Sequence, residues 1–129
     1  MSDADVAARA AQARSFLEAA RMAMEFASEL GDGPSANVAT SNAVLAGIAA
    51  ADAICGKALQ LRSNSSNHAE AIALLRRAYG GDTAANHLKA LVAIKSTAAY
   101  EPRMVTAAKS AEALQHADRL VVAMDKMLL

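Results

Sequence analysis

Apolar residues recur at alternating spacings of four and three along the first part of the chain. This stripe consists of Val6, Ala10, Ala13, Leu17, Ala20, Met24 and Ala27. Such spacing is typical of one face of an α-helix, which completes a turn every 3.6 residues. The glycines and the proline of Gly31-Asp32-Gly33-Pro34 then predict the end of a long first helix.

A second long helix is predicted from about Asn37 to Leu61, with one inner face formed by Val44, Ile48, Ala51, Cys55 and Ala58. A serine-rich turn at 63–66 follows. Asn67 and Glu70 then have the spacing of a capping box, in which each side chain bonds the backbone of the other, and this predicts the start of a third helix. That helix stops at Gly80-Gly81.

Asp82 can cap a fourth helix, which carries apolar residues at Leu88, Leu91, Val92 and Ile94. A turn is expected around Tyr100-Glu101-Pro102, because proline disfavours helix in the residue before it. A last long helix is marked by Leu114, Ala117, Val121, Met124 and Leu128. We therefore expect an all-α fold, an antiparallel up-and-down bundle of about five helices in one domain over residues 1–129.

The composition supports this fold class and excludes others. Apolar types make up 54% of the chain, 35 residues are alanine, and aromatic residues are only 3%. A disordered chain has far less apolar content, and a β-sandwich needs more β-branched and aromatic residues. The single cysteine, Cys55, excludes a disulfide framework and a multi-cysteine zinc site.

Localisation is predicted from the same sequence features. The first residues, Met1-Ser2-Asp3-Ala4-Asp5, lack the basic start of a signal peptide. The longest uncharged stretch, Gly33 to Ala51, is interrupted by proline, serine, threonine and asparagine, so we expect no membrane span. We therefore expect a soluble, cytoplasmic protein.

Charge is unevenly distributed although the net charge is zero. The segment from Lys57 to Arg103 carries seven basic and three acidic residues, whereas the first 56 residues carry three basic and seven acidic ones. A basic segment attracts phosphate, although ordinary solvated helix faces have the same composition. In a simple up-and-down bundle the second–third and fourth–fifth connections share one end, which would bring Arg62 and His68 close to Lys95 and Tyr100.

The pattern resembles the HEPN superfamily over roughly residues 10 to 128. The matching positions are the small-residue second helix with Ala51-Asp52-Ala53, then Leu59, the serine-rich turn, His68-Ala69-Glu70-Ala71, Leu91, Lys95, Ala99-Tyr100 and Ala117-Asp118. HEPN domains are helical bundles of about this size. They are usually dimeric and are often encoded beside a minimal nucleotidyltransferase as a toxin–antitoxin or related pair. The resemblance thus implies a homodimer and a nucleotidyltransferase partner.

Ribonuclease members of this family carry an arginine, a following polar residue and a histidine before the last helix. The corresponding positions here hold Lys95, Ser96 and Tyr100, with Arg103 nearby. Lysine binds phosphate as a point charge without the two-pronged geometry of arginine, and tyrosine is a poor proton shuttle at neutral pH. The resemblance therefore implies a branch with a degenerate motif, whose basic cleft binds phosphate or a partner.

Arg62 and His68 also satisfy the spacing of the catalytic motif, but on a different connection. Three hypotheses follow. The first is a non-catalytic interaction module that presents a basic cleft to a nucleotidyltransferase-type protein, RNA or a nucleotide. The second is a metal-independent endoribonuclease using Arg62 and His68. The third is a purely structural bundle, in which His68 is only a helix-start residue.

The remaining chemistry-bearing residues predict no metal or cofactor. His87 and His116 are interpreted as lone histidines on helix edges, and we expect neither to bind a metal. Cys55 falls on an apolar stripe and is interpreted as a small core residue. The sequence has no phosphate-binding glycine loop and no zinc motif, and it lacks base-stacking aromatics.

Overall fold

Helices account for nearly all of the chain in the computed structural model, which describes residues 1–30, 34–60, 68–100 and 105–129, with only the backbone described at 28–30, 34 and 96–100. In chain order the helices are α1 (Asp3–Leu30), α2 (Pro34–Leu59), α3 (His68–Tyr79), α4 (Thr83–Tyr100) and α5 (Ala107–Leu128). The described residues contain no strand. The predicted all-α bundle of about five helices is confirmed.

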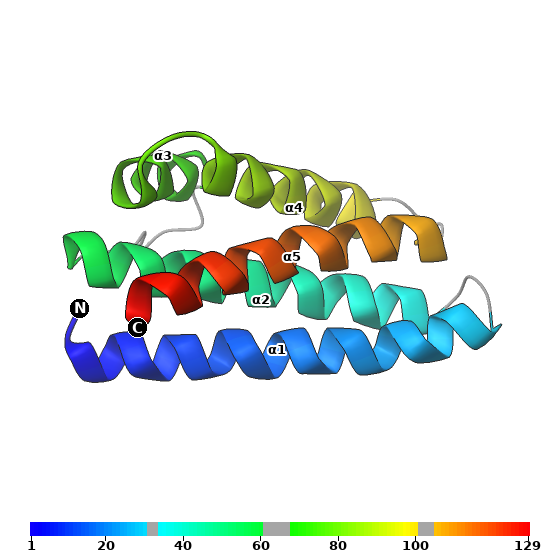
Figure 1. Ribbon diagram of the computed structural model, residues 1–129. Coiled ribbons are helices and arrows are strands. Elements are labelled where there is room, and N and C mark those ends of the chain that lie inside the picture. Colours follow the sequence, from blue (N-terminus) through cyan, green and yellow to red (C-terminus); the bar gives the residue numbers. More distant parts are fainter. Residues whose placement is uncertain (31–33, 61–67, 101–104) are drawn as a thin grey trace.

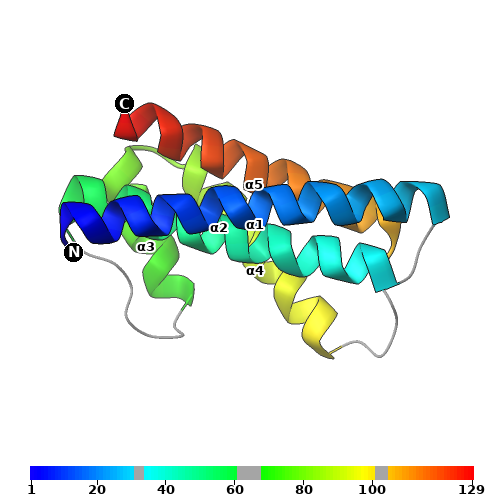
Figure 2. The ribbon, with the colours of Figure 1, turned by 90° about the horizontal axis from the view of Figure 1, so that it is seen from below.

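Helices α1, α2 and α5 lie side by side and nearly along one direction, and α3 and α4 form a second layer over α2 (Figures 1 and 2). Ion pairs fix α1 antiparallel to α5, because Arg14 bonds Asp125 at 2.7 Å and Arg21 bonds Asp118 at 2.7 Å. The backbone carbonyl of Gln60 accepts a hydrogen bond from the amino terminus of Met1. The end of α2 therefore lies beside the start of α1.

The predicted α1 stripe is the buried face of that helix, with Ala13 and Ala20 fully inaccessible to solvent. The expectation of one inner face on the second helix is wrong. Helix α2 contacts each of the other four helices and is buried on most of its circumference, at alanines such as Ala39, Ala46 and Ala53. Small side chains let several helices approach one axis closely, which a single apolar stripe does not permit.

Helix ends follow the local sequence. Gly80 and Gly81 have φ angles of 65° and 96°, in the left-handed region that glycine enters without strain, and they form the turn between α3 and α4. Helix α2 begins at Pro34, three residues earlier than expected, because proline fits the first helical position. Thr106 caps α5 by accepting a hydrogen bond from the backbone nitrogen of Lys109.

Helix α2 is also apolar enough to be compared with a membrane span. Residues Ser35–Leu59 have a mean hydropathy of 1.5 and sufficient length to cross a bilayer. Of the most apolar part of this segment, 67% is buried by the rest of the bundle. The core helix of a bundle has the same length and composition, so this feature is weak evidence for a span. The cytoplasmic location stays a prediction.

Candidate functional site

A strip of α2 lies uncovered between α1 and the α3–α4 layer. Within the described residues, α1 contacts α2 and α5 but neither α3 nor α4. On α2, Val38 is 51% exposed and Leu45, two turns later, is 44% exposed. Residues seven apart share a helix face. Two cavities follow one another beside this strip and constitute the candidate site.

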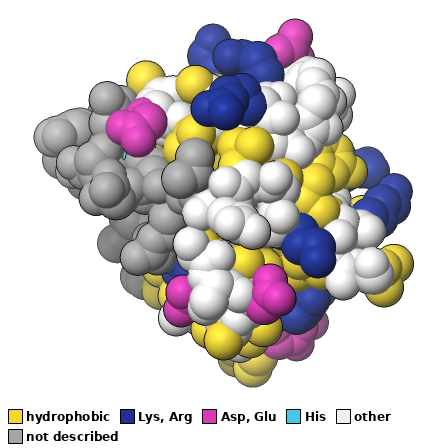
Figure 3. Space-filling view, turned by 90° about the vertical axis from the view of Figure 1, so that its left-hand side faces the viewer, with side chains coloured by type: hydrophobic (Ala, Val, Ile, Leu, Met, Phe, Trp, Pro, Cys, Tyr) yellow, Lys and Arg dark blue, Asp and Glu magenta, His cyan; other side chains and the backbone are white. Residues whose placement is uncertain are grey.

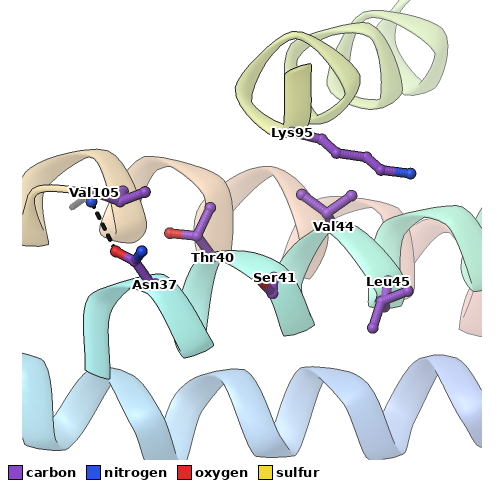
Figure 4. Close-up of a pocket in the computed structure, with 7 residues that line it drawn as sticks. All are labelled: Asn37, Thr40, Ser41, Val44, Leu45, Lys95 and Val105. Carbon is purple, nitrogen blue, oxygen red and sulfur yellow. Dashed lines mark hydrogen bonds between the residues drawn. The ribbon is translucent and has the colours of Figure 1, made fainter. Parts of the chain in front are cut away.

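The larger cavity, here called the Lys95 cavity, has a volume of about 340 Å³. Figure 4 shows Lys95 extending from α4 above the α2 residues of the wall. Its lining is Asn37, Thr40, Ser41, Val44, Leu45, Lys95 and Val105. A volume in this range accommodates a small molecule or several side chains of a partner protein.

Some polar side chains of the Lys95 cavity already make hydrogen bonds within the fold, whereas Lys95 makes no ion pair with the described residues. Asn37 Oδ1 accepts a hydrogen bond from the backbone nitrogen of Val105 at 2.7 Å. The Thr40 hydroxyl donates to the carbonyl of Ala36 at 2.8 Å. Lys95 is exposed and makes no ion pair with any residue that the structure describes. The cavity thus offers a cation that no described residue neutralises, over a wall that is partly apolar.

Lys95 occupies a position that the spacing of α4 assigns to the buried face. It follows Ala84, Leu88 and Leu91 at intervals of four, three and four residues, and those three residues are buried. Lysine is rarely placed on a core-facing stripe, because burying its charge without a partner is costly. The position of Lys95 is therefore unusual from the sequence alone, and this points to a functional role without any resemblance to a family.

The smaller cavity, here called the His68 cavity, has a volume of about 90 Å³. It is lined by Ile48, Ala51, Asp52, His68, Ala71, Leu88 and Val92. Asp52 Oδ2 accepts two hydrogen bonds from the Arg9 guanidinium, at 3.0 and 2.8 Å. The carboxylate beside His68 is therefore already paired with a cation of α1.

Of the predicted site residues, Lys95 and His68 have side chains that the structure describes. Lys95 and His68 line different cavities that share no residue. Arg62 and Arg103 lie outside the described residues, as does the Asn67 of the predicted capping box. Ser96 and Tyr100 belong to the last turns of α4, where only the backbone is described. Lys95 is therefore the predicted site residue whose side chain is seen at the larger cavity.

The expectation that the second–third and fourth–fifth connections share one end of the bundle is wrong. The Asn37–Val105 hydrogen bond places the approach to α5 beside the start of α2. The end of α2 lies at the opposite end, beside Met1. Figure 1 shows the reason, because α3 is short and remains at that same end, and α4 then runs away from it toward the opposite end.

Those basic residues of the middle segment that the structure describes are dispersed in space. Arg76 is paired with Asp82 at 2.7 Å, and Lys57 lines another cavity, between α1, α2 and α5. Seen from the end where the termini lie, the Lys and Arg side chains form separate groups between hydrophobic ones (Figure 3). In the described part of the chain, Lys95 is the only charged residue that lines its cavity.

The interpretation of His87 and His116 as lone histidines is wrong. His87 of α4 and His116 of α5 face each other with their Nδ1 atoms 2.9 Å apart. Partial burial lowers the pKa of His87, and the neighbouring His116 and Arg119 lower it further. No sequence spacing could reveal this pair, because the contact depends on the register of α4 against α5.

Cys55 is a buried core residue, as predicted. Burial raises the pKa of its thiol to about 11, and the charge of Asp52 adds to this effect. A thiol that stays protonated at neutral pH is a poor nucleophile. Within the described residues, no group of three or more His, Cys, Asp or Glu side chains is placed to hold a metal ion.

Comparison with known proteins adds no relative: no family model, curated protein sequence or solved structure matches this chain.

Proposed function

We propose that the protein is a non-catalytic interaction module that binds an apolar, carboxylate-bearing segment of a partner protein in the Lys95 cavity. The carrying observation is Lys95 itself, a cation with no ion-pair partner among the described residues, on the core-facing stripe of α4 above an open cavity. A partner that brings a carboxylate would neutralise this charge, and its apolar side chains would cover Val44 and Leu45. Charge-assisted pairs of this kind fix the register of an interface.

A protein partner fits the cavity better than RNA. Binding of nucleic acid depends on several cations that neutralise several phosphates. Among the described residues, Lys95 is the only cation of the lining, and the other basic side chains of the middle segment are dispersed. Val44, Leu45 and Val105 give the wall an apolar character that suits protein side chains.

The HEPN resemblance suggests a specific class of partner, a nucleotidyltransferase, together with a second copy of the chain. The homodimer rests mainly on this resemblance. In α5, Leu120, Val121 and Met124 are buried within one chain, while Val122 remains 42% exposed. Most of these apolar residues of α5 are therefore used inside the bundle, and the helix itself adds little support for a dimer.

The endoribonuclease alternative pairs His68 with Arg62, which lies outside the described residues, so the structure supports it only through cations whose positions it gives. Lys95 lies in the other cavity, and Asp52, which shares the His68 cavity, is held by Arg9. This alternative is therefore retained only as an outcome of the test below.

The test uses two labelled synthetic amphipathic peptides with the same leucine face, one flanked by glutamates and the other by lysines. Fluorescence anisotropy measures their binding to the wild type, to Lys95→Glu and to Lys89→Glu. Lys89 is exposed on the same helix outside the cavity, and serves as the matched control. We expect the acidic peptide to bind the wild type and the control, and to bind Lys95→Glu at least about tenfold more weakly, the equivalent of 1.4 kcal/mol.

Equal binding of the acidic peptide to wild type and Lys95→Glu, or no binding to either, would overturn the proposal. The same variants are incubated with labelled single-stranded RNA in EDTA. Binding of RNA that depends on Lys95 would assign the cavity to nucleic acid instead. Cleavage that is lost in His68→Ala would establish the endoribonuclease alternative.

A further inference from the structure

A pair of histidines joins α4 directly to α5. The Nδ1 atoms of His87 and His116 lie 2.9 Å apart, and the ring centroids are 5.1 Å apart. This is the arrangement of an N–H···N hydrogen bond, in which one ring donates a proton and the other offers a lone pair. Both rings are half-buried, and the His116 side chain is 24% exposed, so protons from water reach the pair.

The surroundings of His116 indicate which ring donates. Glu112 Oε1 lies 3.9 Å from His116 Nε2. A carboxylate near this nitrogen favours the tautomer that carries its proton there, which leaves His116 Nδ1 as the lone-pair acceptor. His87 then donates through its Nδ1–H group, so a single proton between the facing nitrogens connects the two helices.

This contact tolerates one positive charge but not two. A proton added at Nε2 of His87 leaves the Nδ1–H group in place, and the hydrogen bond becomes stronger because its donor is then charged. A further proton can enter the pair only at His116 Nδ1, the lone pair that accepts the hydrogen bond. Both facing nitrogens then carry hydrogen and both rings are cationic, so a separation of 2.9 Å is no longer favourable.

The charges that act on His87 come from α5. Burial lowers the pKa of His87, and the charges of His116 and Arg119 lower it further. Helices α2 and α3 also contact α4, but among the described residues they contribute none of these charges. The charged residues of α2, Asp52 and Lys57, line other cavities. The environment of His87 therefore opposes a second positive charge in the pair.

Little negative charge is available to offset a second proton on His116. Glu112 is the acidic side chain beside it, and Lys109 shares that carboxylate at 3.2 Å. Helix α1, which also packs against α5, brings Arg21, and this arginine is paired with Asp118 at 2.7 Å. The doubly protonated pair is therefore disfavoured in the folded protein by geometry and by charge.

We propose that His87 and His116 form a pH-sensitive latch, which holds α4 against α5 at neutral pH and loosens when both imidazoles are protonated in mild acid. Helix α4 contributes Lys95 to one cavity and Leu88 and Val92 to the other. A loosened α4 therefore displaces one wall of each cavity. The latch acts on the fold itself and does not depend on what the Lys95 cavity binds.

The direction of the pH dependence follows from the number of protons that each state binds. The pKa of His87 is lowered from its ordinary value of 6.5 in the folded chain, so in mild acid the unfolded chain binds more protons. The stabilising contribution of the pair is therefore present above about pH 6.5 and is lost as the pH falls through the folded-state pKa. Carboxylates titrate at about pH 4, so a comparison of about pH 7.5 with about pH 5.5 reports mainly on histidines.

The first test is urea unfolding of the wild type and of the double variant His87→Asn/His116→Asn at these two pH values. Asparagine keeps a polar side chain in each position but has no proton to titrate in this range. Between the higher and the lower pH, we expect the folding equilibrium constant of the wild type to drop at least about threefold more than that of the double variant. His68→Gln removes an imidazole elsewhere in the fold and retains the pair, so it should retain the drop. Equal pH dependence in the wild type and the double variant would overturn the proposal.

Measurements on the wild type keep the test decisive if the double variant does not fold. Nuclear magnetic resonance of ¹⁵N-labelled histidine rings reports which nitrogens carry protons. At neutral pH we expect a protonated Nδ1 in His87 and an unprotonated Nδ1 in His116, and in acid we expect the two rings to titrate as a coupled pair. Independent titration of the two rings would contradict the latch.

Amide hydrogen exchange then shows whether the effect is local to α4. Protection factors, which correct for the pH dependence of intrinsic exchange, are compared between α4 and α1 at the same two pH values. We expect protection in α4 to fall at least about threefold more in acid than protection in α1, which carries neither histidine. An equal change in both helices would mean that acid weakens the whole bundle and that the pair is only an interhelical hydrogen bond.

Discussion

Asn37 and Val105 lie 68 positions apart in the sequence, yet the side-chain oxygen of Asn37 accepts a hydrogen bond from the backbone nitrogen of Val105 at 2.7 Å. This partly buried contact attaches the approach to α5 to the start of α2. It also forms one boundary of the Lys95 cavity, as Figure 4 shows.

Replacing Asn37 by alanine should therefore destabilise the bundle. The substitution leaves the partly buried Val105 nitrogen without its acceptor, which costs about 1–2 kcal/mol. Asn42→Ala is the matched control, because the side-chain hydrogen bond that the structure gives Asn42 goes to the carbonyl of Val38 in its own helix, on the exposed side. Urea unfolding of both variants measures the difference. Equal free energies of unfolding would show that the Val105 contact adds nothing to stability.

The Arg9–Asp52 ion pair should contribute more than the Arg14–Asp125 pair. The first pair is 24% and 15% exposed, whereas the second is 51% and 47% exposed. Arg9→Met retains the apolar stem but leaves a shielded carboxylate without its cation, so we expect a loss of about 1–3 kcal/mol. Arg14→Met should lose less than about 1 kcal/mol, because water already screens that pair. Denaturant unfolding ranks the two, and a larger loss for Arg14→Met would contradict the argument.

Gly47 is required where α2 crosses α4 and α5. A Cβ atom at this position would collide with Leu91 and lie 3.3 Å from Leu120, and both leucines are fully buried. We expect Gly47→Val to lower the free energy of unfolding by about 1–3 kcal/mol through overpacking. Ala58→Val, at an exposed position of the same helix, should cost only about 0.5 kcal/mol in helix propensity. A change at Gly47 no larger than at Ala58 would mean that the leucines move aside freely.

Because of Cys55, the stability of the fold depends on pH in the alkaline range. Burial raises the pKa of its thiol from about 9 to about 11 in the folded protein. As the pH rises, the thiol of the unfolded chain loses its proton before the thiol of the folded chain does, and this favours unfolding. The contribution of the buried Cys55 thiol to the free energy of unfolding is therefore complete below about pH 9 and is lost as the pH rises through about 11. The free energy of unfolding of the wild type should decline relative to Cys55→Ala over this interval. Parallel pH profiles for the two proteins would refute the prediction.

Local chemistry allowed the helices to be predicted. The glycines at 80 and 81 adopt the positive φ angles that end a helix, and the stripe from Val6 to Ala27 is the buried face of α1. The prediction was wrong for the environment of α2. The apolar spacing of Val44 and Cys55 predicts a single inner face, but alanines on the other sides of α2 are equally buried. Alanine gives a weak hydrophobic signal, so it does not reveal how many neighbours a helix has.

The candidate site was predictable only in part. Lys95 was found through a resemblance, and its place on the stripe of Leu88 and Leu91 is also visible in the sequence. The separation of Lys95 from His68 is not visible in the sequence, because it depends on the path that the short α3 takes at one end of the bundle. The His87–His116 contact depends on the register of two helices. Such long-range geometry has no periodic signature along the chain.

The unequal anchoring of α2 and α3 has a consequence for amide hydrogen exchange. Helix α2 contacts every other helix, so its amides can open only when the whole bundle unfolds. Within the described part of the chain, α3 contacts α2 and α4 alone, and Leu75 is its one fully buried residue. It therefore forms a weakly held cooperative unit that opens below the global unfolding free energy. We expect deuterium to enter α3 before α2, and each opening of α3 to widen the His68 cavity, which α3 partly encloses.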